Sequence, residues 1–176
     1  AMTDADVRHA VREHVLAAPH AIAAGSAGVK LHGANGYLPE QFLSPHTNRR
    51  TGAWGGSVEK RLAFALETAK ETVAAIGGER VGIRISPYGV NAGMKPYPET
   101  DATHTQLVER LAPLGLAYVH VVDHSAMGAP EVPEGLKIAL RRLWPRTFIR
   151  SGGYDRARAE ADVRAHALDE HNRVRQ

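Results

Sequence analysis

Short apolar runs alternate with helix-like segments along this chain, and this alternation restricts the possible folds more than any other feature. The runs that are typical of β-strands lie at residues 28–32, 80–86, 116–122 and 147–151. Strands that alternate with helices predict right-handed βαβ units and therefore a parallel sheet. Such a sheet is either open and doubly wound or part of a (β/α)₈ barrel.

Helices are predicted before, between and after these strands. The first begins at Thr3 or Asp4, and we expect Pro19 to interrupt it, because proline lacks the amide hydrogen that an inner helical position donates. Ser57 is expected to cap the most regular helix, which Gly77 ends. The other predicted helical segments are residues 20–24, 102–114, 133–143 and the residues from 155 onward.

Polar residues lie at or near the carboxyl end of every predicted strand. In chain order they are His32 and Asn35, Arg84 and Ser86, His120, Asp123 and His124, and Gly152 and Gly153. Chemistry at the carboxyl ends of successive strands favours a barrel, whose active site lies on that face. A whole barrel takes about 250 residues. The sequence therefore predicts one α/β domain over residues 1–176, a partial (β/α)₈ TIM barrel of about four parallel βα units.

Composition excludes several classes of function. The chain has no cysteine, so disulfides and thiolate sites are absent, and it has no apolar run long enough for a membrane span. The formal charge is only +3 and aromatic residues make up 6%, which predicts no nucleic-acid partner. The first residues carry acids and lack the pattern of a secretory signal, so the expected location is cytoplasmic.

The segment HGANGYL, residues 32–38, has three side chains that form hydrogen bonds, set among residues too small to pack a core. Taken alone, it allows two interpretations. His32, Asn35 and Tyr37 bind a ligand, or His32 satisfies backbone groups, Asn35 forms a turn with Gly36, and Tyr37 packs.

Longer motifs add a family resemblance. The block HGANGYLPEQFLSPHTNRRTGAWGGSVEKRLAF, followed by GIRISPYG, resembles the central motifs of the Old Yellow Enzyme family, the flavin-dependent ene-reductases. LAYVHVVDHSAMGAPEVP and IRSGGYD are similar to its alkene-reductase branch, so the resemblance spans about residues 2–165 and leaves a divergent tail at 166–176. It implies a (β/α)₈ barrel of the NADH:flavin oxidoreductase type that binds flavin mononucleotide (FMN), with strands four to seven in this chain.

The resemblance also implies a reaction. His32 and Asn35 would donate hydrogen bonds to the carbonyl or nitro oxygen of a small activated alkene and stabilise the negative charge that develops there. Tyr37 would protonate the α-carbon, and a phenol with a reference pKa of about 10 holds its proton at neutral pH. The hydride would come from NAD(P)H through FMN.

Two groups are expected to bind FMN. Strand alternation places Arg84 on the face opposite Ile83 and Ile85, where an anionic or electron-rich partner is needed, and the resemblance makes this partner the flavin ring. Ser151, Gly152 and Gly153 lie between a strand and a helix start, which suits a phosphate.

Two other functions stay open. One is a half-barrel remnant without catalysis, and the other is a metal-dependent barrel hydrolase that uses His120, Asp123 and His124, although we expect no metal site. A sheet of four strands also has two open edges, which could pair with a second copy and give a homo-oligomer. We further expect an uncovered apolar inner surface, made of Val29, Leu31, Ile83, Ile85 and Val119.

Overall fold

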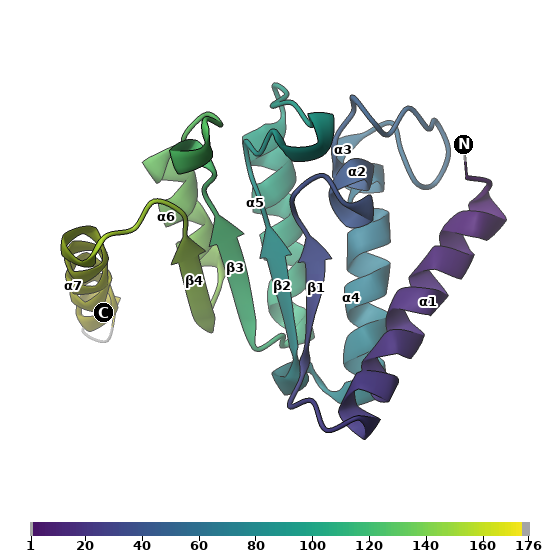
Figure 1. Ribbon diagram of the computed structural model, residues 1–176, viewed down its shortest axis with the longest axis horizontal. Coiled ribbons are helices and arrows are strands. Elements are labelled where there is room, and N and C mark those ends of the chain that lie inside the picture. Colours follow the sequence, from purple (N-terminus) through teal and green to yellow (C-terminus); the bar gives the residue numbers. More distant parts are fainter. Residues whose placement is uncertain (1, 174–176) are drawn as a thin grey trace.

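One parallel sheet forms the centre of the protein (Figure 1) in the computed structural model, which describes residues 2–173. Its strands are β1 (Val29–Gly33), β2 (Val81–Ile85), β3 (Tyr118–Val122) and β4 (Thr147–Ser151), and they pair in the order β1-β2-β3-β4. All neighbours are parallel, with His32 opposite Arg84 and Arg84 opposite His120. The four predicted strands and their parallel arrangement are therefore confirmed.

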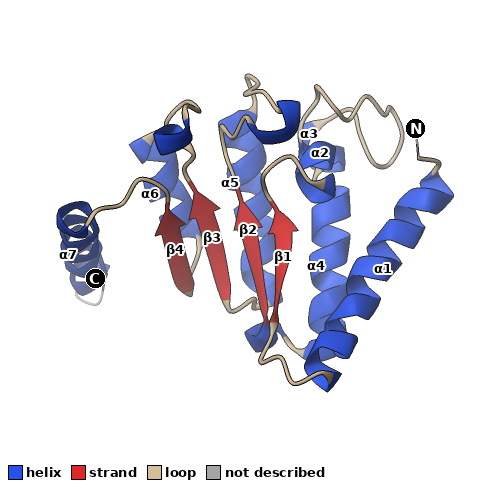
Figure 2. Ribbon diagram, in the orientation of Figure 1, coloured by secondary structure: helices blue, strands red, loops and turns tan. Residues whose placement is uncertain are grey.

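Helices connect the strands and lie mainly on one side of the sheet. Figure 2 shows α4, α5 and α6 behind the strands, α1 beside α4, and α7 beyond β4. No helix among the described residues is long and apolar enough to cross a membrane. The predicted tail at 166–176 continues α7 as far as residue 173, and its last three residues lie outside the described part. The helices are α1 (Asp4–Ala23), α2 (Leu38–Leu43), α3 (Val58–Arg61), α4 (Ala63–Ile76), α5 (Thr100–Leu111), α6 (Glu134–Leu143) and α7 (Arg156–Arg173).

The main core lies between the sheet and these helices. Leu31, Ile83, Ile85 and Val119 point into it and are at most 9% exposed, with Val29 packed against them. The expectation that these five residues form an uncovered surface is therefore wrong. Because side chains alternate along a strand, the apolar residues face the helices and the residues between them point to the opposite side of the sheet. We call this opposite side the bare face, and it carries Lys30, His32, Arg84 and His120.

The N-terminal helix corrects a second expectation, because α1 runs without a break from Asp4 to Ala23 and includes Pro19. Thr3 caps it in a capping box with Asp6, and Val7 and Val11 are buried on one face. Pro19 lies on the exposed side, within two turns of the helix end. Only a few hydrogen bonds follow the proline, so the helix tolerates the one that it removes.

A smaller cluster supports the segment that follows β1. Val7 and Val11 of α1 pack with Phe42, Trp54 and Phe64, and the rings of Phe42 and Phe64 stack at 4.4 Å. Since Phe42 belongs to α2, this cluster fixes α2 to the helical layer. The loop between β1 and α2, which is the middle of the HGANGYL segment, is therefore held at both ends.

Candidate active site

The three predicted substrate-binding and catalytic residues lie together at the carboxyl end of β1. His32 is in the strand, Asn35 is in the loop, and Tyr37 is the N-cap residue just before α2. The rings of His32 and Tyr37 are 5.1 Å apart between centroids, and Tyr37 is 61% exposed. The packed role for Tyr37 is thus excluded, and its hydroxyl can reach a ligand.

The backbone of this loop adopts a conformation that few residues tolerate. Asn35 and Gly36 have φ values of +61° and +76°, and asparagine and glycine are the residues that adopt the left-handed region most readily. A Cβ at Gly36 would lie 2.6 Å from the Asn91 carbonyl oxygen, so the loop is packed against the segment after β2. The side-chain Oδ1 of Asn35 is buried and has no hydrogen-bond partner. Asn35 therefore has a polar group available for a ligand.

A buried carboxylate that the sequence analysis missed holds the loop in place. Glu40 accepts a hydrogen bond from the Ser86 hydroxyl (2.6 Å) and another from the Gly36 amide, while Ser86 accepts one from the Asn35 amide (3.0 Å). Burial raises the pKa of Glu40, although both hydrogen bonds act in the opposite direction. Pro39 and Glu40 at the second and third helical positions are a signal for a helix start that could have revealed α2.

Arg84 lies opposite His32 on the neighbouring strand. It is half-buried on the bare face, and its Nε has no hydrogen-bond partner. Burial lowers the pKa of His32, with further lowering from Arg84 and Lys30. The pKa of His120 falls to about 4 through burial and the charges of Lys30 and Arg84. Both imidazoles are therefore neutral at pH 7.

The predicted phosphate loop lies at the end of β4, three strands away from His32. Neighbouring strands are about 4.8 Å apart, so the two groups are separated by about 14 Å across the sheet. Gly152 and Gly153 have φ values of +109° and +63°, and a Cβ at Gly152 would come within 1.7 Å of the Asp123 carbonyl oxygen. The Ser151 hydroxyl lies 2.7 Å from Nε2 of His120.

A cavity of about 940 Å³ borders this loop. Ser151, Gly152 and Gly153 line it, together with Tyr154 and residues of β4 and α7. The three predicted phosphate-binding residues are thus next to open space large enough for part of a cofactor.

Asp123 and its neighbours are arranged differently from a metal centre. Its carboxylate pairs with Lys137 of α6 at 2.9 Å and accepts hydrogen bonds from the amides of Ser125 and Val132. Burial alone would raise the pKa of Asp123, but Lys137 and Ser125 outweigh it and the pKa is lowered. Within residues 2–173, no three His, Asp or Glu side chains form a cluster that could hold a metal ion.

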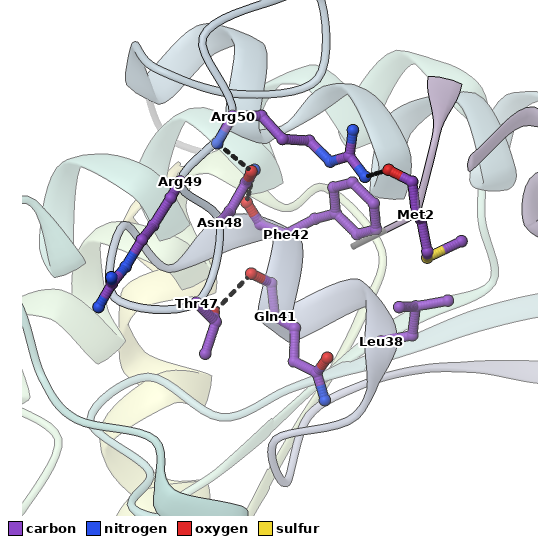
Figure 3. A pocket seen from close by; sticks show the side chains of 8 residues that line it. All are labelled: Met2, Leu38, Gln41, Phe42, Thr47, Asn48, Arg49 and Arg50. Carbon is purple, nitrogen blue, oxygen red and sulfur yellow. Dashed lines mark hydrogen bonds between the residues drawn. The ribbon is translucent and has the colours of Figure 1, made fainter. Parts of the chain in front are cut away.

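A separate cavity of about 470 Å³ lies between α2 and the N-terminus (Figure 3). Arg50 closes one side of it, where the guanidinium binds the Met2 carbonyl oxygen and pairs with Asp4 at 3.4 Å. Thr47 donates a hydrogen bond to the Gln41 carbonyl oxygen at 2.7 Å. None of the predicted site residues lines this cavity.

Comparison with known proteins identifies the family. The profile of the NADH:flavin oxidoreductase / NADH oxidase family matches residues 1–168. The chain belongs to this family. The aldehyde reductase FrzD of Cladobotryum sp is 38% identical over an alignment of 173 residues that covers 96% of this chain and 46% of that protein. The chanoclavine-I aldehyde reductase fgaOx3 of Penicillium roqueforti (strain FM164) is 40% identical over an alignment of 171 residues that covers 94% of this chain and 44% of that protein.

Solved structures agree with this membership. Morphinone reductase in complex with tetrahydroNAD superimposes with a TM-score of 0.86 and 35% identity, over 94% of this chain and 44% of that one. The chain thus spans less than half the length of the relatives it matches. The resemblance to the Old Yellow Enzyme family and the expectation of a partial barrel are both confirmed.

Proposed function

We propose that this chain supplies the substrate-binding and proton-donating part of an FMN-dependent ene-reductase. In this reaction NAD(P)H provides the hydride, and the substrate is a small alkene activated by a carbonyl or nitro group. The observation that carries the proposal is the placement of His32, Asn35 and Tyr37 close together at the carboxyl end of β1, with Arg84 beside His32 on β2. The named relatives, which include aldehyde reductases and morphinone reductase, support a small-molecule substrate.

His32 and Asn35 orient and polarise the substrate. A neutral imidazole donates through one ring nitrogen, and burial together with two nearby cations keeps His32 neutral. Asn35 donates through its side-chain Nδ2 group, which forms no hydrogen bond with any described residue, and the left-handed turn holds the backbone of Asn35 at the rim of the sheet. Two neutral donors at one oxygen stabilise the charge that develops there as the alkene is reduced.

Tyr37 delivers the proton. Its exposed ring lies 5.1 Å from the ring of His32, so the side chain is next to one of the two proposed oxygen-binding groups. Proton transfer from a positioned side chain typically contributes a factor of about 10² to 10⁴ to the rate.

The chain also contains groups that fit FMN. The unpartnered Nε of Arg84 faces the bare side of the sheet and suits the flavin ring, and Ser151, Gly152 and Gly153 border a large cavity and suit the phosphate. When bound, FMN accepts a hydride from NAD(P)H and passes it to the β-carbon of the alkene. Arg84 would then stabilise the negative charge of the reduced ring.

Flavin stoichiometry and turnover test this proposal. The purified chain, incubated with excess FMN and passed through a desalting column, should retain flavin absorbance and should oxidise NADPH when 2-cyclohexenone is added. A chain that retains no flavin would contradict the proposal and favour the half-barrel remnant without catalysis.

A further inference from the structure

The bare face of the sheet carries positive charge without a compensating acid. Its ionisable side chains are Lys30 and His32 on β1, Arg84 on β2, and Tyr118 and His120 on β3. None of the four described strands places an aspartate or glutamate on this face. Since both histidines are neutral at pH 7, the charge resides on Lys30 and Arg84.

These two cations are close enough to act on one ligand. Lys30 is opposite Gly82, and Arg84 is two residues further along the same strand. A strand spacing of about 4.8 Å and a rise of about 6.6 Å for two residues give a Cα separation of about 8 Å. Gly82 has no side chain, and the ring of Tyr118 fills the space over it, because a Cβ at Gly82 would meet this ring at 2.1 Å.

No acidic residue in the described part of the chain neutralises either cation. Arg84 has an unpartnered Nε, and Lys30 is exposed and forms no ion pair with any described residue. Cations elsewhere in the molecule do find acids, as Lys137 does with Asp123 at 2.9 Å and Arg110 with Glu59 at 3.0 Å. A half-buried cation without an acid is costly unless a ligand supplies the negative charge.

We propose that Lys30 and Arg84 together bind one anionic group of a small-molecule ligand on the bare face of the sheet. This inference rests on the proposed function for the identity of the ligand, which is the flavin ring in its reduced, anionic state. Lys30 is then a second cofactor-binding residue, and it favours reduced over oxidised flavin because only the reduced ring carries the charge.

Anaerobic calorimetry with reduced FMN tests the assignment. Lys30→Met should weaken binding by a factor of about two to five at low ionic strength, which is the range of an exposed ion pair, and Lys30→Arg should restore it. Lys70→Met is the matched control, because Lys70 is exposed on α4 and distant from the bare face, and it should bind as the wild type does. The effect of Lys30→Met should shrink in 0.5 M salt and be smaller with oxidised FMN.

Riboflavin, which has the flavin ring of FMN but no phosphate, shows which of the two groups Lys30 contacts. An equal loss of affinity for reduced riboflavin and reduced FMN supports the ring, and a loss confined to FMN would overturn this assignment. Unchanged FMN binding in Lys30→Met would overturn the inference and leave the proposed function intact.

A wild-type chain that binds no flavin contradicts the proposed function, and the anion site is then decided with inorganic phosphate. Phosphate held by the two cations should raise the pKa of His32 and His120, measured by NMR, in the wild type and not in Lys30→Met. Identical titrations of both proteins would overturn the anion site as well.

Discussion

The proposed proton donation by Tyr37 can be tested without disturbing the fold. It is exposed, and its side chain forms no cap with α2, so Tyr37→Phe leaves the fold unchanged. We expect the variant to bind FMN as the wild type does and to reduce flavin with NADPH at a similar rate. Reoxidation by 2-cyclohexenone should slow about 10²-fold or more, measured by stopped-flow absorbance. An equal loss in both half-reactions would refute the role of proton donor.

A side chain at Gly36 is unfavourable for two reasons: the backbone has a positive φ, and a Cβ would meet neighbouring atoms. A pair of variants can separate these two costs. Gly36 and Gly25 both have positive φ values, +76° and +93°, but only a Cβ at Gly36 meets other atoms. Alanine in the left-handed region costs about 1–2 kcal/mol. We expect Gly25→Ala to lower the free energy of unfolding by that amount and Gly36→Ala to lower it further, measured by urea denaturation. Equal losses would show that the loop moves away from Asn91 without cost.

At the scale of elements, Glu40 connects α2, the β1 loop and the end of β2. Its folded pKa is raised, so the folded state binds more protons than the unfolded state between the ordinary value of 4.5 and the raised one. The contribution of Glu40 to stability is therefore greatest below pH 4.5 and is lost as the pH rises through the raised value. Glu40→Gln keeps an acceptor for Gly36 and should remove this pH dependence.

The measurement is the difference in free energy of unfolding between the wild type and Glu40→Gln at pH 4.5 and at pH 8. We expect the variant to gain relative stability at the higher pH. Glu40→Ala is the contrasting variant, because it leaves the Gly36 amide and the Ser86 hydroxyl without their acceptor, and it should be destabilised by about 1–3 kcal/mol at both values. A constant difference for Glu40→Gln would contradict the raised pKa.

The elements were predicted well wherever one local pattern decides them. Strand runs and the cap at Ser57 follow from hydrophobic spacing and side-chain chemistry, and the structure confirms both. The helix that was expected to run from this cap to Gly77 is divided at Leu62 into α3 and α4. The expected break at Pro19 is wrong because the free-energy cost of a proline in a helix depends on how near it lies to the helix end and on whether it faces the solvent. The Glu40 contacts were missed because the hydrogen bond from Ser86 joins residues 46 positions apart. Proximity in the chain brings His32, Asn35 and Tyr37 together, whereas their roles stay predictions.

At the scale of the whole molecule, the bare face and the open edges have opposite effects on self-association. β1 and β4 are the edge strands, and each leaves backbone groups that another strand could pair with. A second copy placed face to face would bring Lys30 and Arg84 of both copies together, which is unfavourable. Charge therefore favours pairing at the edges over face-to-face docking. Each copy carries a formal net charge of +3, so salt should strengthen edge pairing because it screens the repulsion between the copies as a whole.

We accordingly expect the chain to form dimers or larger assemblies whose population rises between 0.05 and 0.5 M salt, in sedimentation velocity experiments. Ile149 is 36% exposed on the edge strand β4, and Ile149→Lys should weaken association, because a charged residue on an edge opposes strand pairing. Leu16→Lys is the control, since Leu16 is 55% exposed on α1, which lies at the opposite end of the molecule from β4 (Figure 1). A monomer at every salt concentration, or equal effects of the two variants, would show that the edges do not pair. Flavin binding through Lys30 weakens with salt, so the two processes are distinguished by the sign of their salt dependence.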